Sequence, residues 1–163
     1  MTFFVLGVDP GVSGAVAFYS PGLPERIAVE DVPVAGGEIS APHLASMIRR
    51  FAPSMAVVER VNAFPGQGVS SVFNFGRAYG DVRGVIGALN IPLHLVSPQK
   101  WKKHFGLSSD KDQSRALAVR RFPVVAEHFK LKKHDGRAEA ALIALYGAEV
   151  LCKSMSNAEL SGA

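Results

Sequence analysis

The sequence predicts a single α/β domain whose mixed sheet is flanked by helices. Three strands, a helix, a strand, a helix, a strand and further helices follow one another along the chain, an order that favours this class. Hydrophobic residues make up 48% of the chain and charged residues 20%, a composition typical of globular proteins. The length of 163 residues suits one domain.

Three predicted strands open the chain. Residues 3–9 and 13–20 are apolar runs joined by the tight turn DPGVSG, and residues 26–33 follow the turn SPGLP. Because Pro and Gly favour turns at these points, we expect an antiparallel meander. Two later apolar runs, 55–61 and 92–98, predict a fourth and a fifth strand.

Helical spacing appears between and after these strands. Residues 39–53 place Leu44, Ile48 and Phe51 on one side, and Pro53 lies beyond the expected end. Residues 69–89 predict a long helix whose glycines recur every three or four positions, so we expect that glycine face to pack closely against another helix or the sheet. The remaining expected elements are helices at 99–105, 111–122 and 135–153, which complete one domain over residues 1–153, and a flexible tail at 154–163.

Positive charge is concentrated in one segment. The formal net charge is +4, and residues 99–133 hold ten of the 18 Lys and Arg residues against three acids. Such a segment is either a solvated face or a surface that binds a polyanion such as nucleic acid.

The cysteine content and the N-terminus favour a reducing cytoplasm. The single cysteine, Cys152, excludes an internal disulfide framework and a zinc site built from several cysteines. The first residues lack a basic segment and their apolar run is interrupted at Asp9, so we expect no secretory signal. No apolar stretch reaches the ~18 residues that a membrane span requires.

Four carboxylates stand where apolar residues are expected. Asp9 and Glu59 lie near the ends of two strands that we expect to be parallel neighbours, and Asp135 and Glu139 share one face at the start of the last helix. If that helix packs across the sheet, all four converge at the edge where ligands of open α/β sheets bind.

Converging carboxylates repel one another, so this arrangement predicts a bound cation. An oxygen-only ligand set without a cluster of His or Cys selects a hard ion, Mg²⁺ or Mn²⁺. Two such ions about 4 Å apart would activate a water and stabilise the leaving oxygen of a phosphodiester. The basic segment would then hold a nucleic-acid backbone over the metals.

Each acid also has a local explanation. Asp9 precedes Pro-Gly and can be a turn residue, and Glu59 can pair with Arg60 or Arg77. Asp135 can be a helix cap, and Glu139 can interact with the helix dipole. These explanations do not account for why the separated acids fall at the same end of the expected sheet.

These segments together resemble the RuvC family of Holliday-junction resolvases, within the ribonuclease H-like superfamily, particularly its phage and prophage versions. GVDPG at 7–11 matches the family's first catalytic aspartate, and VVERV at 57–61 its strand-four glutamate. HDGRAEAALIALYG at 134–147 resembles the closing acidic helix, and the stretch 65–103 also has the family pattern. The resemblance covers roughly residues 3–150.

The resemblance implies a structure-selective endonuclease that resolves four-way and related branched DNA as a homodimer. Its sheet order would be 3-2-1-4-5, and the glycine-rich helix 69–89 would be the dimer surface. The implied metal ligands and catalytic residues are Asp9, Glu59, Asp135 and Glu139, with Lys111 also catalytic. The implied DNA-binding residues are Lys102 and Lys111, which would contact phosphates near the cleavage site, together with Lys100, Lys103 and Arg115.

The sequence departs from the family pattern at three points. The turn after Asp9 is shorter than in bacterial chromosomal members of the family. The closing acids are four residues apart here, whereas many members space them by three, which leaves a catalytically weak junction-binding module open. The family places an aromatic residue, which acts as a wedge, shortly after its strand-four glutamate. In this sequence an alignment without gaps puts Asn62 at that position, and the aromatic Phe64 follows two residues later. We expect Asn62 and Phe64 to contact DNA, with Phe64 stacking at the junction or serving only as a loop anchor. The acids alone also fit a broader branched-DNA or RNA-hybrid nuclease.

Overall fold

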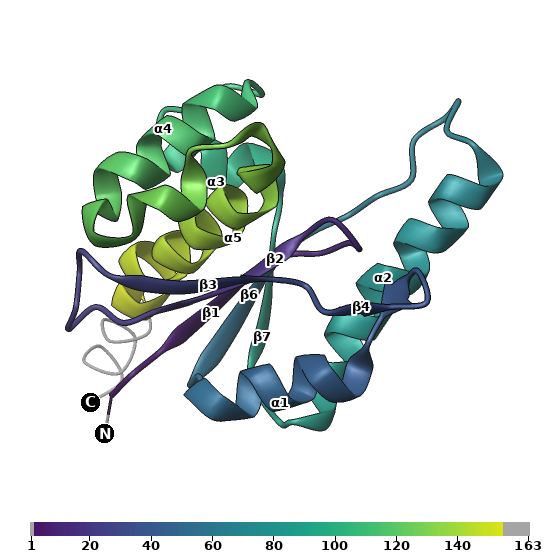
Figure 1. The fold of residues 1–163 in the computed structure, drawn as a ribbon, viewed down its shortest axis with the longest axis horizontal. Coiled ribbons are helices and arrows are strands. Elements are labelled where there is room, and N and C mark those ends of the chain that lie inside the picture. Colours follow the sequence, from purple (N-terminus) through teal and green to yellow (C-terminus); the bar gives the residue numbers. More distant parts are fainter. Residues whose placement is uncertain (1, 155–163) are drawn as a thin grey trace.

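The computed structural model describes residues 2–154 and has a five-stranded mixed sheet at its centre (Figure 1). The strand order is β3-β2-β1-β6-β7. β1 is antiparallel to β2 and parallel to β6, and this confirms the predicted order 3-2-1-4-5 once the five strands are counted along the chain. The strands are β1 Val5–Asp9, β2 Ala15–Tyr19, β3 Ile27–Asp31, β6 Met55–Glu59 and β7 Leu93–Val96.

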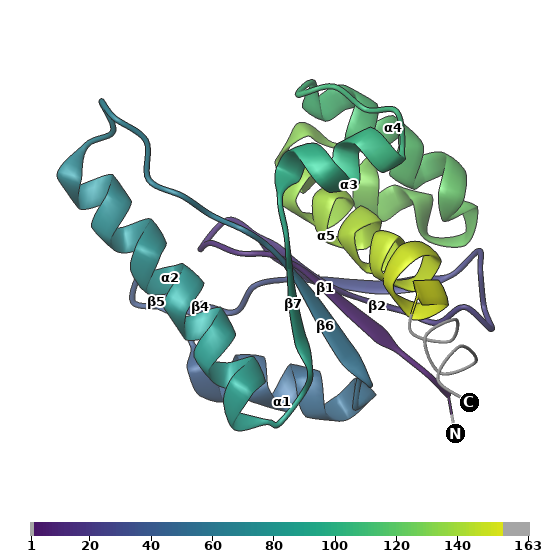
Figure 2. The ribbon, with the colours of Figure 1, turned by 180° about the vertical axis from the view of Figure 1, so that it is seen from behind.

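Helices cover both faces of the sheet in two separate groups (Figures 1 and 2). One face carries α1 Ala41–Phe51 and α2 Val69–Ala88, and the other carries α5 Asp135–Tyr146. α3 Pro98–His104 and α4 Lys111–Arg121 lie on the α5 side. Two 3₁₀ segments, Pro123–Phe129 and Lys132–His134, connect α4 to α5, and a π-helical turn, Gly147–Leu151, continues α5.

The alternation of side chains along β1 decides which residues face which helices. Val5 packs in the core under α5, whereas Leu6 and Val8 pack in the core formed with α1 and α2. Because successive side chains of a strand point to opposite faces, Asp9 falls on the α5 side. Along β6, Met55 and Val57 pack under α5, so Glu59 points to that same side.

α5 lies very close to the sheet because small residues meet at the contact. A Cβ atom added to Gly7 would lie 2.3 Å from both Ala140 O and Ala144 N, so no side chain fits at this point of β1. Gly147 approaches β6 in the same way, since an added Cβ would lie 2.7 Å from a methyl carbon of Val57. This contact explains why small residues, Ala140 and Ala144, face Gly7 from α5.

The glycine face of α2 does not pack as the sequence predicts. A Cβ added at any of four positions would meet no atom within 4 Å, so the expectation of close packing against another helix or the sheet is wrong for residues 2–154. α2 instead packs through Ala78, Val82 and Ile86 on its other side. The four open glycines are Gly76, Gly80, Gly84 and Gly87.

Two further features lie outside the sequence expectations. A small hairpin of β4 Val34–Ala35 and β5 Glu38–Ile39 turns at Gly36 and Gly37, both of which have positive φ. The expected tail at 154–163 lies, apart from Ser154, outside the described residues. No helix in the described chain is long and apolar enough to span a membrane.

Candidate active site

Three carboxylates from three separate segments meet at one end of the sheet. Asp9 is the last residue of β1, Glu59 is the last residue of β6, and Glu139 lies in the second turn of α5. One oxygen of each carboxylate lies within 4.8 Å of the others. The parallel pairing of β1 with β6 brings the two strand ends together, and α5 supplies the third acid from above.

Close packing at the start of α5 fixes the position of Glu139. A Cβ added to Gly136 would lie 2.8 Å from Ser13 O and 3.2 Å from Asp9 Oδ2, so only glycine lets the helix rest on the β1–β2 turn. The turn itself is equally tight, because a Cβ on Gly14 would lie 1.9 Å from Asp9 O. The first turn of α5 is thus held against Asp9, one turn before Glu139.

Burial and mutual repulsion act on these acids. Burial raises the pKa of Asp9 well above its usual value, and the neighbouring Glu139 and Glu59 carboxylates raise it further. Burial also raises the pKa of Glu59, with Glu139 adding to the shift. Lys111 and Lys102 oppose both shifts but do not cancel them. The arrangement therefore disfavours three negative charges unless a further cation is present.

Basic and aromatic side chains surround the cluster. Lys102 Nζ and Lys111 Nζ each lie 3.7 Å from Glu139 Oε1. Trp101 is fully buried, and its Nε1–H donates a hydrogen bond of 2.7 Å to Glu59 Oε2. This bond opposes the rise in the pKa of Glu59 and fixes the direction of its carboxylate.

The donor set fits a hard divalent cation. Three carboxylates with oxygens within 4.8 Å of one another, without His or Cys among them, are the kind of ligands that Mg²⁺ and Mn²⁺ prefer. The raised pKa values of Asp9 and Glu59 show the electrostatic cost that such a cation would remove.

Asp135, the fourth predicted ligand, is not in the group of three. Its carboxylate is ion-paired with Arg115, which also pairs with Asp112. Asp135 still lines the same cavity as Asp9. Arg115, predicted to bind DNA, thus has two carboxylate partners within the chain.

The contacts of Glu59 and Asp135 also test the local explanations that the sequence offers for these two acids. Glu59 bonds Trp101 rather than Arg60 or Arg77, and Arg77 pairs with Glu38 at 2.6 Å. Asp135 is the first helical residue of α5 and not its N-cap, which is His134.

The other predicted DNA-binding residues lie outside the cluster. Phe64 is 65% exposed on the loop between β6 and α2, which projects from the sheet in Figure 1. The backbone N–H of Phe64 donates to Gln67 Oε1 at 2.7 Å, so the Gln67 side chain bonds to the backbone of its own loop. Asn62 lines a separate cavity with Phe75 and Tyr79. Lys100 and Lys103 are exposed on α3.

Trp101 contacts the cluster although the sequence analysis does not single it out. Its hydrogen bond to Glu59 is seen only in the structure. The available signal was chemical: a buried tryptophan needs an acceptor for its N–H, and few acceptors occur near the strand ends.

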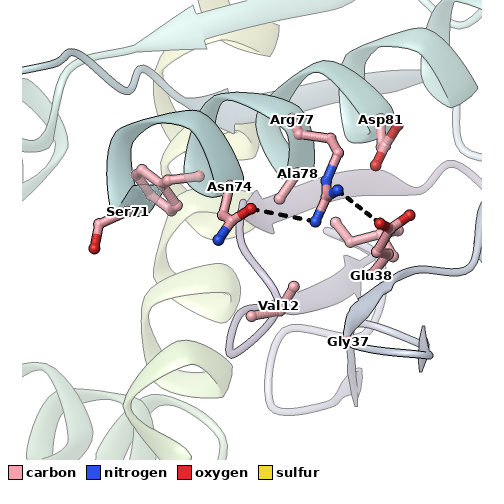
Figure 3. Close-up of a pocket in the computed structure, with 10 residues that line it drawn as sticks. Val12, Gly37, Glu38, Ser71, Asn74, Arg77, Ala78 and Asp81 are labelled. Atoms are coloured by element: carbon pink, nitrogen blue, oxygen red, sulfur yellow. Dashed lines mark hydrogen bonds and ion pairs between the residues drawn. The ribbon is translucent and has the colours of Figure 1, made fainter. Parts of the chain in front are cut away.

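Two cavities adjoin the cluster. One, of about 450 Å³, lies between the β1–β2 turn and the 3₁₀ segment before α5, and Asp9, Lys111 and Asp135 line it. The second, of about 320 Å³, lies between the β4–β5 hairpin and α2 (Figure 3). Val12 and Phe75 line both cavities, so the two are neighbours at the end of β1.

Comparison with solved structures identifies the fold. RuvC of Thermus thermophilus in complex with a Holliday junction has a TM-score of 0.66 and 18% identity, over 93% of this chain and 96% of that one. The yeast mitochondrial Holliday junction resolvase gives 0.52 and 17% over 88% and 78%. The fowlpox virus resolvase bound to junction DNA gives 0.51 and 15% over 89% and 98%.

Sequence comparison adds no further assignment. No family model matches the chain, and no curated protein matches it. The resemblance to RuvC noted in the sequence is therefore confirmed by structure at the level of architecture: this chain has the ribonuclease H-like fold of RuvC-type Holliday-junction resolvases.

Proposed function

We propose that this protein is a divalent-metal-dependent endonuclease that cuts branched DNA, with four-way junctions as its main substrate. The observation that carries the proposal is the convergence of Asp9, Glu59 and Glu139 from three segments at the end of a resolvase-like sheet. Structural neighbours that were solved with Holliday junctions support the choice of substrate.

The reaction we propose is hydrolysis of a phosphodiester by water, without a covalent enzyme intermediate. Asp9, Glu59 and Glu139 would hold Mg²⁺ or Mn²⁺, and we propose two ions per site, with Asp135 as a fourth ligand if it leaves Arg115. A bound divalent cation supplies Lewis-acid stabilisation of the charge that develops on the phosphate.

The remaining residues of the site position charge. Trp101 holds the Glu59 carboxylate in one orientation, and Lys102 and Lys111 place positive charge beside Glu139. Their ammonium groups would bind the phosphate oxygens of the cleaved strand. Lys100, Lys103 and Phe64 are exposed and would contact DNA farther from the cut.

A panel of substrates tests this function. We expect Mg²⁺- or Mn²⁺-dependent nicking of synthetic four-way junctions, with weaker cleavage of three-way junctions and flaps and none of linear duplex. Asp9→Asn and Glu59→Gln should each abolish nicking while junction binding in Ca²⁺ persists. Nicking that survives in both variants would overturn the proposal.

We also propose that the protein acts as a homodimer through α2. Its four glycines face open space, and Val69 and Phe73 on the same helix are 87% and 67% exposed. A two-fold dimer would present two sites to a four-way junction, as paired nicks require. Sedimentation equilibrium should give a dimer for the wild type and a monomer for Gly80→Arg, and a dimer in both would exclude α2 as the surface.

A second candidate is a junction-binding module with weak catalysis. The ion pair between Asp135 and Arg115, which leaves three carboxylates in the group, favours it. The panel separates the two candidates, because this module would bind junctions in Ca²⁺ and fail to nick them in Mg²⁺ or Mn²⁺.

A further inference from the structure

The 450 Å³ cavity beside Asp9 is lined by only one of the three clustered carboxylates. Asp9 and Lys111 line it, but Glu59 and Glu139 do not. Its far wall is the 3₁₀ segment Lys132–His134, from which Lys132 and Lys133 line the cavity. The cavity therefore leads from the cluster toward two lysines with no role in the site described above.

Lys132 and Lys133 differ in their charge environment from the other lysines near the site. Lys102 and Lys111 are paired with Glu139, whereas neither Lys132 nor Lys133 forms an ion pair within residues 2–154. The second acid in the cavity, Asp135, is paired with Arg115. The uncompensated charge on that wall is positive, so the cavity favours an anion.

The two lysines are held in place by the surrounding backbone. His134 is buried, its N–H donates to Leu131 O at 2.8 Å, and its Nδ1 accepts from Leu131 N at 3.3 Å. Two residues later, Gly136 rests on Ser13 of the β1–β2 turn. The segment that carries the two lysines and the turn that follows Asp9 are thus joined by direct packing, which reduces the cost of ordering the cavity around a ligand.

The neighbouring cavity in Figure 3 offers no comparable site for an anion. Its arginine, Arg77, is paired with Glu38 and lies 3.4 Å from Asn74 Oδ1. Asp81 also lines that cavity, so two acids face one base. Of these two cavities next to the cluster, the lysine-lined one is the better match for a phosphate.

We propose that the cavity between the β1–β2 turn and Lys132–Lys133 binds the phosphate one nucleotide away from the phosphodiester that is cut, on the Asp9 side of the site. This inference rests on the proposed nuclease function and assigns the path of the cleaved strand. Lys132 and Lys133 are positioning residues: they hold the neighbouring phosphate, and the three carboxylates face the reacting one.

Binding measurements on the full chain test the proposal. We expect the double variant Lys132→Gln/Lys133→Gln to bind a fluorescent four-way junction more weakly in Ca²⁺. The slope of log K against log salt is negative, and we expect it to become less steep by about 0.9 for each lost phosphate contact. The matched control, Arg26→Gln/Arg49→Gln, removes two exposed charges at the opposite end of the sheet and should leave affinity and slope near wild type. Equal loss in both variants would show a non-specific charge effect and overturn the proposal.

A methylphosphonate scan locates the contact. Each phosphate near the cut is made neutral in turn, and the affinity is measured with wild type and with the double-lysine variant. Neutralising the adjacent phosphate should weaken binding to wild type and have little further effect on the variant, since the two changes remove one contact. The assignment would be overturned if the losses from the lysine substitutions and from neutralising that phosphate were additive, or if a different phosphate showed the non-additive loss. If wild type fails to prefer junctions over duplex, the proposed function itself fails, which is a different result.

Discussion

α5 and α2 cover opposite faces of the sheet, but their glycines lie in different surroundings. On the α5 face, Gly7, Gly136 and Gly147 leave no room for a Cβ atom. On α2, Gly76 and Gly80 meet nothing within 4 Å. The first set is explained by packing inside the chain, which places Glu139 over Asp9 and Glu59. The second set has no such explanation within residues 2–154, and it is the observation behind the proposed dimer surface on α2.

The largest effect is expected from the tightest contact. Gly7→Ala should lower the free energy of unfolding by about 3 kcal/mol or more, because the new methyl group meets the backbone of α5, which cannot move aside. Urea-induced unfolding monitored by circular dichroism measures the loss. A loss below about 1 kcal/mol would show that α5 is packed more loosely than the structure indicates.

Without bound metal, the burial of Asp9 and its repulsion by Glu59 and Glu139 should lower the free energy of unfolding. The raised pKa of Asp9 means that the folded state binds its proton more tightly than the unfolded state does, so stability falls as the pH rises through that pKa. In EDTA, Asp9→Asn should therefore stabilise the protein at neutral pH, and its advantage should shrink as the pH falls toward the ordinary aspartate value.

The matched control for this effect is Asp81→Asn, which neutralises a carboxylate on α2. We expect it to change the free energy of unfolding little, because Asp81 lies outside the group of three carboxylates. Urea unfolding at several pH values compares the two variants, and a gain from Asp9→Asn that is independent of pH would contradict the electrostatic explanation.

The variant Trp101→Phe tests whether Trp101 orients the Glu59 carboxylate. An aromatic ring is kept, but the N–H donor to Glu59 and the second ring of the buried indole are lost, at a cost of about 2–4 kcal/mol in stability. Because that bond opposes the rise in the pKa of Glu59, its loss should raise this pKa further and move the acidic limb of the cleavage profile to higher pH. An unchanged pH profile would leave Trp101 a packing residue only.

The smallest effect is expected on α2. Gly80→Ala should stabilise the isolated chain by up to about 1 kcal/mol, since alanine favours the helix and the added methyl group meets open space. Urea unfolding at low protein concentration tests this gain. A loss of the size expected for Gly7→Ala would remove the contrast between the two helices.

Much of this fold follows from local pattern. The apolar runs at 3–9 and 13–20 and the turn DPGVSG between them predict the antiparallel pairing of β1 with β2, and an acid at the end of an apolar strand points to a cleft. Asp9, Glu59 and Glu139 could therefore be placed together from the sequence.

The remaining contacts depend on distances between segments that no local pattern contains. Spacing alone places Asp135 on the same helix face as Glu139, but only the structure shows that Arg115 is close enough to bind it. The partner of Trp101 is 42 residues away in sequence, and the open face of α2 depends on where the β4–β5 hairpin and the sheet end.

The most direct test is to measure metal binding by the three carboxylates. Titration of Mn²⁺ into the metal-free protein, followed by electron paramagnetic resonance of the free ion, should show saturable binding by wild type and by Asp81→Asn. Asp9→Asn, Glu59→Gln and Glu139→Gln should each bind far more weakly, because each removes one of three oxygens that face a common point. Undiminished binding by these three variants would contradict the account.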